Sequence, residues 1–179
     1  IRGVGKTTTA RIIAKALNCI DDGSKEDPSF EICNNCSPCK SINNGNFLDV
    51  IEVDAASRTG VDGIREIIDS VIYSPNNARY KVYIIDEVHM LSNAAFNALL
   101  KTLEEPPQNV KFIFATTEIK KIPATIISRC QKFDLQRVDL KTLSNHLKNI
   151  CFFMYAIYLE HIFNNVKGII FNLNSKKIF

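Results

Sequence analysis

A short run near the amino end has the residue types that bind a polyphosphate. The run Gly3-Val4-Gly5-Lys6-Thr7-Thr8 matches the second half of the phosphate-loop pattern G-x-x-x-x-G-K-[ST]. Its glycines let backbone N–H groups turn toward phosphate oxygens without a Cβ in the way. Lys6 is placed to reach the β- and γ-phosphates of ATP, and the Thr7 hydroxyl to ligate Mg²⁺. A chance string in a basic loop is the alternative, and the pattern favours nucleotide binding by Gly3 to Thr8.

An acidic pair further along the chain can supply a metal ligand and a base. Asp86-Glu87 follows a run of apolar residues typical of a strand buried on both faces. Open α/β sheets bind their ligands at the carboxyl ends of strands. We therefore expect Asp86 to hold Mg²⁺, directly or through water, and Glu87 to polarise the water that attacks the γ-phosphate. A solvated acidic pair is the alternative, and the presence of Lys6 and Thr7 favours the catalytic interpretation.

Two further residues are candidates for catalysis. Thr117 ends the next expected strand, where its hydroxyl can orient the attacking water or contact the γ-phosphate. The alternative is a β-branched residue that simply finishes a strand. Arg129, within Ser128-Arg129-Cys130, is either a surface cation or an arginine finger for a neighbouring subunit's nucleotide. Composition alone favours the surface cation.

Four cysteines have the spacing of a metal site. Cys33, Cys36 and Cys39 follow a C-x₂-C-x₂-C pattern, and Cys19 lies upstream at the end of the first expected helix. Four thiolates make a closed tetrahedral Zn²⁺ site, which is structural because no position is left for water. An iron–sulfur cluster is the alternative, but the run lacks a fourth cysteine three residues on and the proline after it. The pattern therefore favours Zn²⁺.

Charge gives little evidence for nucleic-acid binding. A net charge of +3 is too small to argue for it, so the case depends on local geometry. Residues 57–62 lead into an expected helix whose first N–H groups, with Arg58 and Arg65, can bind DNA phosphates. Solvated surface is the default interpretation of these residues.

Length and composition indicate one α/β domain, or one domain and part of another, in 179 residues. An apolar content of 46% is that of a globular protein with a core. The opening residues lack the charged, then apolar, then small-residue order of a secretory signal. The clustered cysteines suit metal binding in a reducing compartment. We therefore expect a cytoplasmic protein with no membrane contact.

Strands and helices are expected to alternate, which predicts βα units and a parallel sheet flanked by helices. In a phosphate-loop fold, a central strand feeds the loop, and here that strand would precede residue 1. We expect this strand and the first loop glycine to be missing from the sequence, so that the fragment folds poorly by itself. The expected strands are residues 48–54, 81–87, 110–117 and 132–136, and the expected helices are 10–18, 61–72, 92–105 and 123–129.

The last thirty residues differ in composition from the rest. Ile, Phe, Asn, Lys and Tyr, which share A/T-rich codons, make up 20 of the 30 residues from Ile150 to Phe179. Out-of-frame translation of an A/T-rich gene explains this bias, and a disordered segment is expected. The alternative is a genuine apolar helix, since residues 150–159 are uninterrupted apolar residues, too few to span a membrane.

Taken together, the motifs resemble one family. RGVGKTTTARIIAKALNC, LDVIEVDAASRTGVDGIREI, YKVYIIDEVHMLSNAAFNALLKTLEEPP, FIFATTE and PATIISRC are similar to the gamma/tau subunit of bacterial DNA polymerase III. That subunit is the AAA+ ATPase of the sliding-clamp loader. The resemblance covers about residues 1–150, and the cysteine run directly after the phosphate-loop helix narrows it further.

The resemblance implies a fold and a domain organisation. It implies an AAA+ phosphate-loop ATPase core over residues 1–139, with an inserted zinc module at about 19–40. Residues 140–150 resemble the start of a lid domain, and residues 151–179 form a divergent tail. The lid's arginine sensor, the oligomerisation domain and the polymerase- and helicase-binding tail of the family have no counterpart in the sequence.

The resemblance also implies a function. ATP binding would let a pentamer of clamp-loader subunits open the sliding clamp on primer–template DNA, and hydrolysis would release the loader. Thr117 would sense the γ-phosphate, Arg129 would act as the finger on a neighbouring subunit, and the segment from Arg58 to Arg65 would track DNA. Polymerase and helicase contacts are expected only of a full-length chain.

Two other functions stay open. The chain can be an inactive fragment or pseudogene product that keeps only a zinc-binding or partner-binding module. It can also be another AAA+ DNA motor, such as a Holliday-junction motor, although the cysteine run and LLKTLEEPP fit the clamp loader better. We expect weak or no ATPase activity of the fragment by itself.

Overall fold

The computed structural model describes residues 4–21, 23, 27–57 and 61–165. Two compact units divide the chain, Ile1–Leu135 and Gln136–Phe179. The first unit contains every residue proposed above for nucleotide, metal or catalysis. Each unit is described by itself.

A parallel sheet forms the centre of the first unit. Within the described residues it has three strands in the order β1 (Val50–Asp54), β2 (Lys81–Asp86) and β3 (Val110–Phe114). Both pairings are parallel, and Asp54 at the end of β1 is in register with Asp86 at the end of β2. The predicted α/β class with a parallel sheet is therefore confirmed, and the carboxyl ends of the strands lie at one edge.

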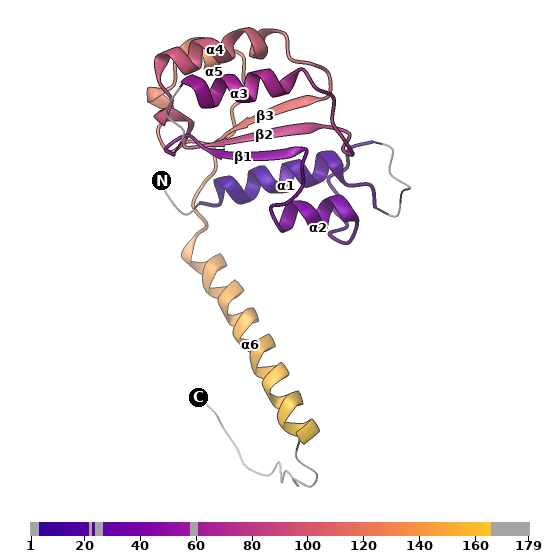
Figure 1. The fold of residues 1–179 in the computed structure, drawn as a ribbon. Coiled ribbons are helices and arrows are strands. Elements are labelled where there is room, and N and C mark those ends of the chain that lie inside the picture. The colour runs from indigo at the N-terminus through magenta and orange to yellow at the C-terminus, as the bar shows by residue number, and fades with distance from the viewer. Residues whose placement is uncertain (1–3, 22, 24–26, 58–60, 166–179) are drawn as a thin grey trace. The chain divides into compact units, whose positions relative to one another are not determined.

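Helices cover both faces of this sheet (Figure 1). On one face lie α1 (Lys6–Asn18) and α2 (Ser37–Asn43), and on the other lie α3 (Val61–Val71), α4 (Asn93–Glu104) and α5 (Ala124–Ile127). Each face of the sheet has its own hydrophobic core, because successive side chains of β2 point to opposite faces. Val82 and Ile84 pack with the small residues Ala10 and Ala14 of α1, whereas Tyr83 and Ile85 belong to the larger core of α3 and α4.

The helix ends follow the local sequence. Ser92 begins α4 by accepting a hydrogen bond from the N–H of Ala95 at 3.2 Å, and Pro106-Pro107 follows its last turn. Two short 3₁₀ helices, η1 (Val88–Met90) and η2 (Ile119–Lys121), follow β2 and β3 at the carboxyl edge of the sheet. They place the residues directly after both strands near one another.

Two expected elements differ from the structure. The strand predicted over residues 132–136 is wrong, because this segment has no strand partner among the described residues and Phe133 is 71% exposed. Its alternating apolar residues therefore have no core to cover. In contrast, α2 was not predicted, and it begins at Ser37 with Pro38 in its first turn.

The second unit contains one long helix, α6 (Leu140–Asn165). Asp139 caps it, accepting hydrogen bonds from the N–H of Thr142 at 2.6 Å and its hydroxyl at 3.0 Å. These bonds hold the pKa of Asp139 below its ordinary value. The helix continues through residues 151–165. An apolar helix was the alternative to the disorder expected for the segment after residue 150. Among the described residues, no helix has the length and apolarity needed to cross a membrane.

Candidate nucleotide and metal sites

The phosphate loop leads directly into α1. Gly5 is the N-cap residue and has a φ of 83°, a left-handed conformation that strains other residue types. Its carbonyl accepts hydrogen bonds from the N–H of Thr9 at 2.8 Å and from the Thr9 hydroxyl at 2.9 Å. Val4 precedes this turn and Thr8 lies exposed in the first turn of α1, while Gly3 lies outside the described residues. The N–H groups of this first turn are available to an anion, as in other helices.

The loop and the acidic pair meet at the end of β2. The Thr7 hydroxyl donates a hydrogen bond to Oδ2 of Asp86 at 2.5 Å, although 79 positions separate the two residues. Lys6 Nζ lies 3.9 Å from Oε1 of Glu87, and these side chains are 17% and 26% exposed. The structure thus brings a lysine, a hydroxyl and two carboxylates together at a site whose side chains are partly exposed to solvent. This combination can bind phosphate and a divalent cation.

The chain turns sharply at Glu87. Glu87 has a φ of 46°, which is uncommon for a residue with a side chain, and its N–H donates to Oδ1 of Asp86 at 2.8 Å. Its carboxylate oxygen Oε2 accepts hydrogen bonds from the Thr117 hydroxyl at 3.0 Å and the Thr117 N–H at 3.3 Å. Thr117 is therefore in the site, in contact with the predicted base.

Three neighbouring residues, His89, Thr116 and Glu118, also contact this network. His89 Nδ1 lies 3.0 Å from the Thr116 hydroxyl oxygen and 3.3 Å from Oε2 of Glu87, and its Nε2 lies 3.5 Å from Oε1 of Glu118. A hydrogen bond and charge from Lys121 hold the pKa of Glu118 below its ordinary value. The signal in the sequence was position, since His89 lies two residues after Glu87, and Thr116 and Glu118 adjoin Thr117.

Arg129 lies just after α5 and contacts its own chain. Its Nη2 donates to Oε1 of Glu104, the last residue of α4, at 2.5 Å. Its Nη1 donates to the carbonyl of Thr125 at 2.7 Å. Two nitrogens of the guanidinium thus have acceptors within the same chain. The finger role of Arg129 stays a prediction.

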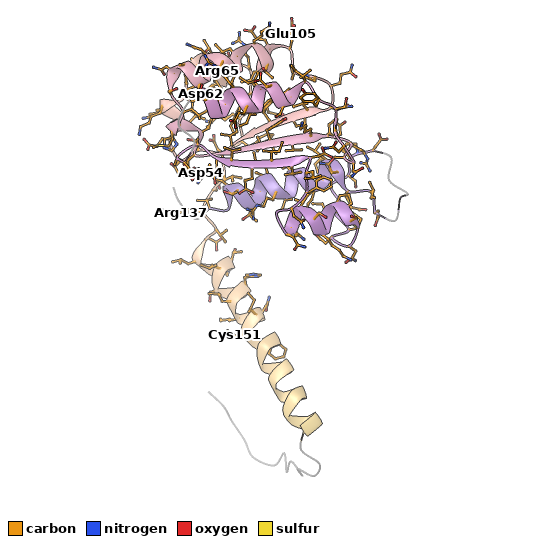
Figure 2. The ribbon with its side chains drawn as sticks, viewed as in Figure 1. Asp54, Asp62, Arg65, Glu105, Arg137 and Cys151 are labelled. Carbon is orange, nitrogen blue, oxygen red and sulfur yellow. The ribbon has the colours of Figure 1, made fainter. Side chains whose placement is uncertain are left out.

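The segment proposed for DNA is only partly described, because Arg58 lies outside the described residues. Arg65 Nη1 lies 3.3 Å from Oδ1 of Asp62 one turn earlier on α3 (Figure 2). Both side chains are largely exposed, so the contact is weak. DNA binding by this segment stays a prediction.

The four cysteines lie together at the end of α1, in the segment that follows it, and in the first turn of α2. The sulfurs of Cys19, Cys33, Cys36 and Cys39 are all within 4.8 Å of one another, and Cys19 and Cys33 are 3.6 Å apart. Sulfurs at about 2.3 Å from a tetrahedral Zn²⁺ ion are separated by about 3.8 Å. All four are free thiols. The cluster therefore fits a four-thiolate Zn²⁺ site without large rearrangement.

The thiols differ in acidity. Burial raises the pKa of Cys36, but backbone hydrogen bonds from Cys39 and Ile20 outweigh this effect and lower the pKa to about 7. Burial is the largest cause that raises the pKa of the Cys39 thiol, followed by its hydrogen bonds to Cys36 and Cys19. Cys36 therefore loses its proton more readily than Cys39, whose proton must be displaced when a metal binds.

Most of the sequence matches a known family. The family model described as "DNA polymerase III, delta subunit" matches residues 1–139. The chain belongs to the DNA polymerase III delta-subunit family. The match includes both sites described above, from the phosphate loop to Arg129.

The chain is also similar to curated gamma and tau subunits. It is 57% identical over 149 residues to DNA polymerase III subunit gamma of Buchnera aphidicola subsp. Acyrthosiphon pisum, covering 83% of this chain and 40% of that protein. It is also 57% identical over 149 residues to subunit tau of Bacillus subtilis, covering 83% of this chain and 26% of that protein. The resemblance to gamma/tau subunits inferred from the motifs is confirmed.

A third relative matches a longer part of the chain. Subunit gamma of Buchnera aphidicola subsp. Baizongia pistaciae is 48% identical over 169 residues, covering 94% of this chain and 43% of that protein. This match extends beyond residue 150, into the region with the A/T-rich codon bias. The chain spans less than half the length of each of these three relatives.

Proposed function

We propose that this chain is the ATP-hydrolysing part of a clamp-loader gamma/tau subunit of the bacterial replicative DNA polymerase III. In the cytoplasm it would bind and hydrolyse ATP to load the sliding clamp on primer–template DNA. The observation that carries this proposal is the meeting of Lys6 and Thr7 with Asp86 and Glu87 at the carboxyl edge of a parallel sheet. A phosphate-binding cation, two metal-ligand oxygens and a carboxylate base are what the reaction needs.

Each residue has a defined role in the proposal. The loop residues Gly3 to Thr8 would hold the phosphates, with Lys6 at the β- and γ-phosphates. Thr7 and Asp86 would hold Mg²⁺, which neutralises charge on the phosphate oxygens when bound. Glu87 would accept the proton of the attacking water, and Thr117 would report the γ-phosphate because its hydroxyl already lies against that base.

Part of the catalytic machinery would come from a second subunit. Arg129 would stabilise the transition state at the nucleotide of a neighbouring subunit. Its contacts with Glu104 and Thr125 support this role, since a finger must be held in one orientation to act across an interface. Assembly with other clamp-loader subunits, the clamp and DNA is therefore part of the proposal.

The four cysteines would hold Zn²⁺ as a structural ion. The cluster joins the end of α1 to the start of α2, since Cys19 follows α1 while Cys36 is the N-cap residue of α2. A closed site of four thiolates leaves no position for a substrate. Zn²⁺ would therefore stabilise the segment beside the phosphate-loop helix without taking part in hydrolysis.

The test is ATP hydrolysis by the full-length protein assembled with its partner subunits, with and without clamp and primer–template DNA. Wild type should hydrolyse ATP in a Mg²⁺-dependent reaction that clamp and DNA stimulate, and Asp86→Asn should lose this activity. Asp54→Asn is the matched control, because Asp54 ends the neighbouring strand in register with Asp86. Equal activity of Asp86→Asn and wild type would contradict the proposal.

A further inference from the structure

The two oxygens of the Glu87 carboxylate have different surroundings. Oε2 accepts two hydrogen bonds from Thr117 and lies 3.3 Å from His89 Nδ1. Oε1 lies on the side of Lys6, 3.9 Å from its Nζ. One oxygen is therefore anchored to the protein, and the other is turned toward the residue that would reach the phosphates.

His89 is fixed more firmly than an ordinary surface histidine. Its side chain is only 7% exposed. Its helix η1 is tied to the sheet, because the N–H of Val88 donates to the carbonyl of Ala115 at 3.0 Å. The ring contacts Thr116 through Nδ1 and Glu118 through Nε2. The Thr116 hydroxyl is itself held by the N–H of Glu118 at 3.0 Å.

We propose that His89 is a positioning residue for Glu87. With its proton on Nδ1, His89 donates to Oε2 beside the Thr117 hydroxyl, and Oε1 is left as the oxygen that accepts a proton. The inference deepens the proposed ATPase function and rests on it. In that reaction the water oxygen bonds to the γ-phosphorus, and the bond from this phosphorus to the bridging oxygen breaks with its electron pair on ADP. The proton of the water passes to Oε1.

His89 is placed to orient the base, not to act as one. Its Nδ1 faces Oε2 and the Thr116 hydroxyl, and its Nε2 faces Glu118, so both ring nitrogens already have partners in the protein. A purely structural role in packing η1 would depend on the volume of the ring. A positioning role depends on an N–H group at the place of Nδ1.

Three substitutions separate these two roles in the assembled full-length protein. In His89→Asn the amide nitrogen falls close to the place of Nδ1, whereas in His89→Gln it falls close to the place of Nε2. His89→Ala removes both nitrogens. His146→Ala, on α6 in the other unit, is the control for loss of a histidine. The measurements are kcat and KM for ATP, with Mg²⁺-ATP binding and melting temperature for each variant.

We expect kcat of His89→Gln and His89→Ala to fall about tenfold, part of the typical contribution of a general base, with KM unchanged. His89→Asn should stay within about twofold of wild type, since it restores the donor to Glu87. Similar losses in all three variants, a rise in KM at constant kcat, or no change in any would overturn the role of His89. A wild type without Mg²⁺-dependent ATP hydrolysis would instead overturn the proposed function, and this inference with it.

Discussion

Substitution of Glu104 by Gln tests how Arg129 is held. The Glu104 carboxylate contacts Nη2 of Arg129, and the carbonyl of Thr125 accepts from Nη1. Glu104→Gln keeps the shape and an acceptor oxygen but removes the negative charge. One of the two contacts on the guanidinium is then weakened, while the second is unchanged.

The expected size of the effect follows from exposure. The side chains of Glu104 and Arg129 are 50% and 33% exposed, so water screens much of their attraction. Such pairs contribute about 0.2–1 kcal/mol, and a loss of about 1 kcal/mol lowers the ratio of the held to the released conformer about fivefold. We therefore expect DNA-stimulated hydrolysis to fall by up to about fivefold, while the melting temperature falls by no more than about 4 °C.

The assay is steady-state ATP hydrolysis by the assembled complex at saturating DNA and clamp. ATP binding to the variant subunit should be unchanged, because the finger acts on the nucleotide of its neighbour. Glu105→Gln is the matched control, since Glu105 adjoins Glu104 at the end of α4 (Figure 2) and the same substitution is made there. Hydrolysis by Glu104→Gln at or above the wild-type rate, or an equal loss in Glu105→Gln, would refute the reasoning.

Two further predictions concern the finger and the metal. Arg129→Ala should lower DNA-stimulated hydrolysis about a thousandfold or more with ATP affinity unchanged; a turnover equal to wild type would remove Arg129 from catalysis. Zn²⁺ affinity, measured by competition with a chelator, should fall as the pH falls from 8 to 6. The fall should steepen below pH 7, where Cys36 also takes up a proton that the metal must displace. A constant affinity over this range would exclude thiolate ligation.

Several features were predictable because local patterns determine them. The apolar run ending in Asp86 is buried on both faces in β2, as its composition indicates. The phosphate loop lies at a helix N-terminus, and Ser92 caps α4 as its type and position predict. The meeting of Lys6 with the acidic pair followed from the rule that ligands bind at the carboxyl ends of parallel strands.

Other features depend on contacts between distant segments, which no local pattern specifies. His89 joins the site because η1 and the residues after β3 leave the sheet at the same edge. The contact between Arg129 and Glu104 depends on how α5 packs beside α4. For residues 132–136, the alternating pattern was present but a strand partner among the described residues was not, so pattern alone gave the wrong element.

The most direct test of the ATPase site is calorimetric titration of Mg²⁺-ATP into full-length protein and its Lys6→Ala variant. The wild type should bind ATP, and Lys6→Ala should show no measurable heat, because the loop loses the cation that faces the phosphates. Lys15→Ala is the control, since Lys15 is on the same helix but donates to Asn34, and it should bind like wild type. Equal ATP affinity of Lys6→Ala and wild type would contradict the account.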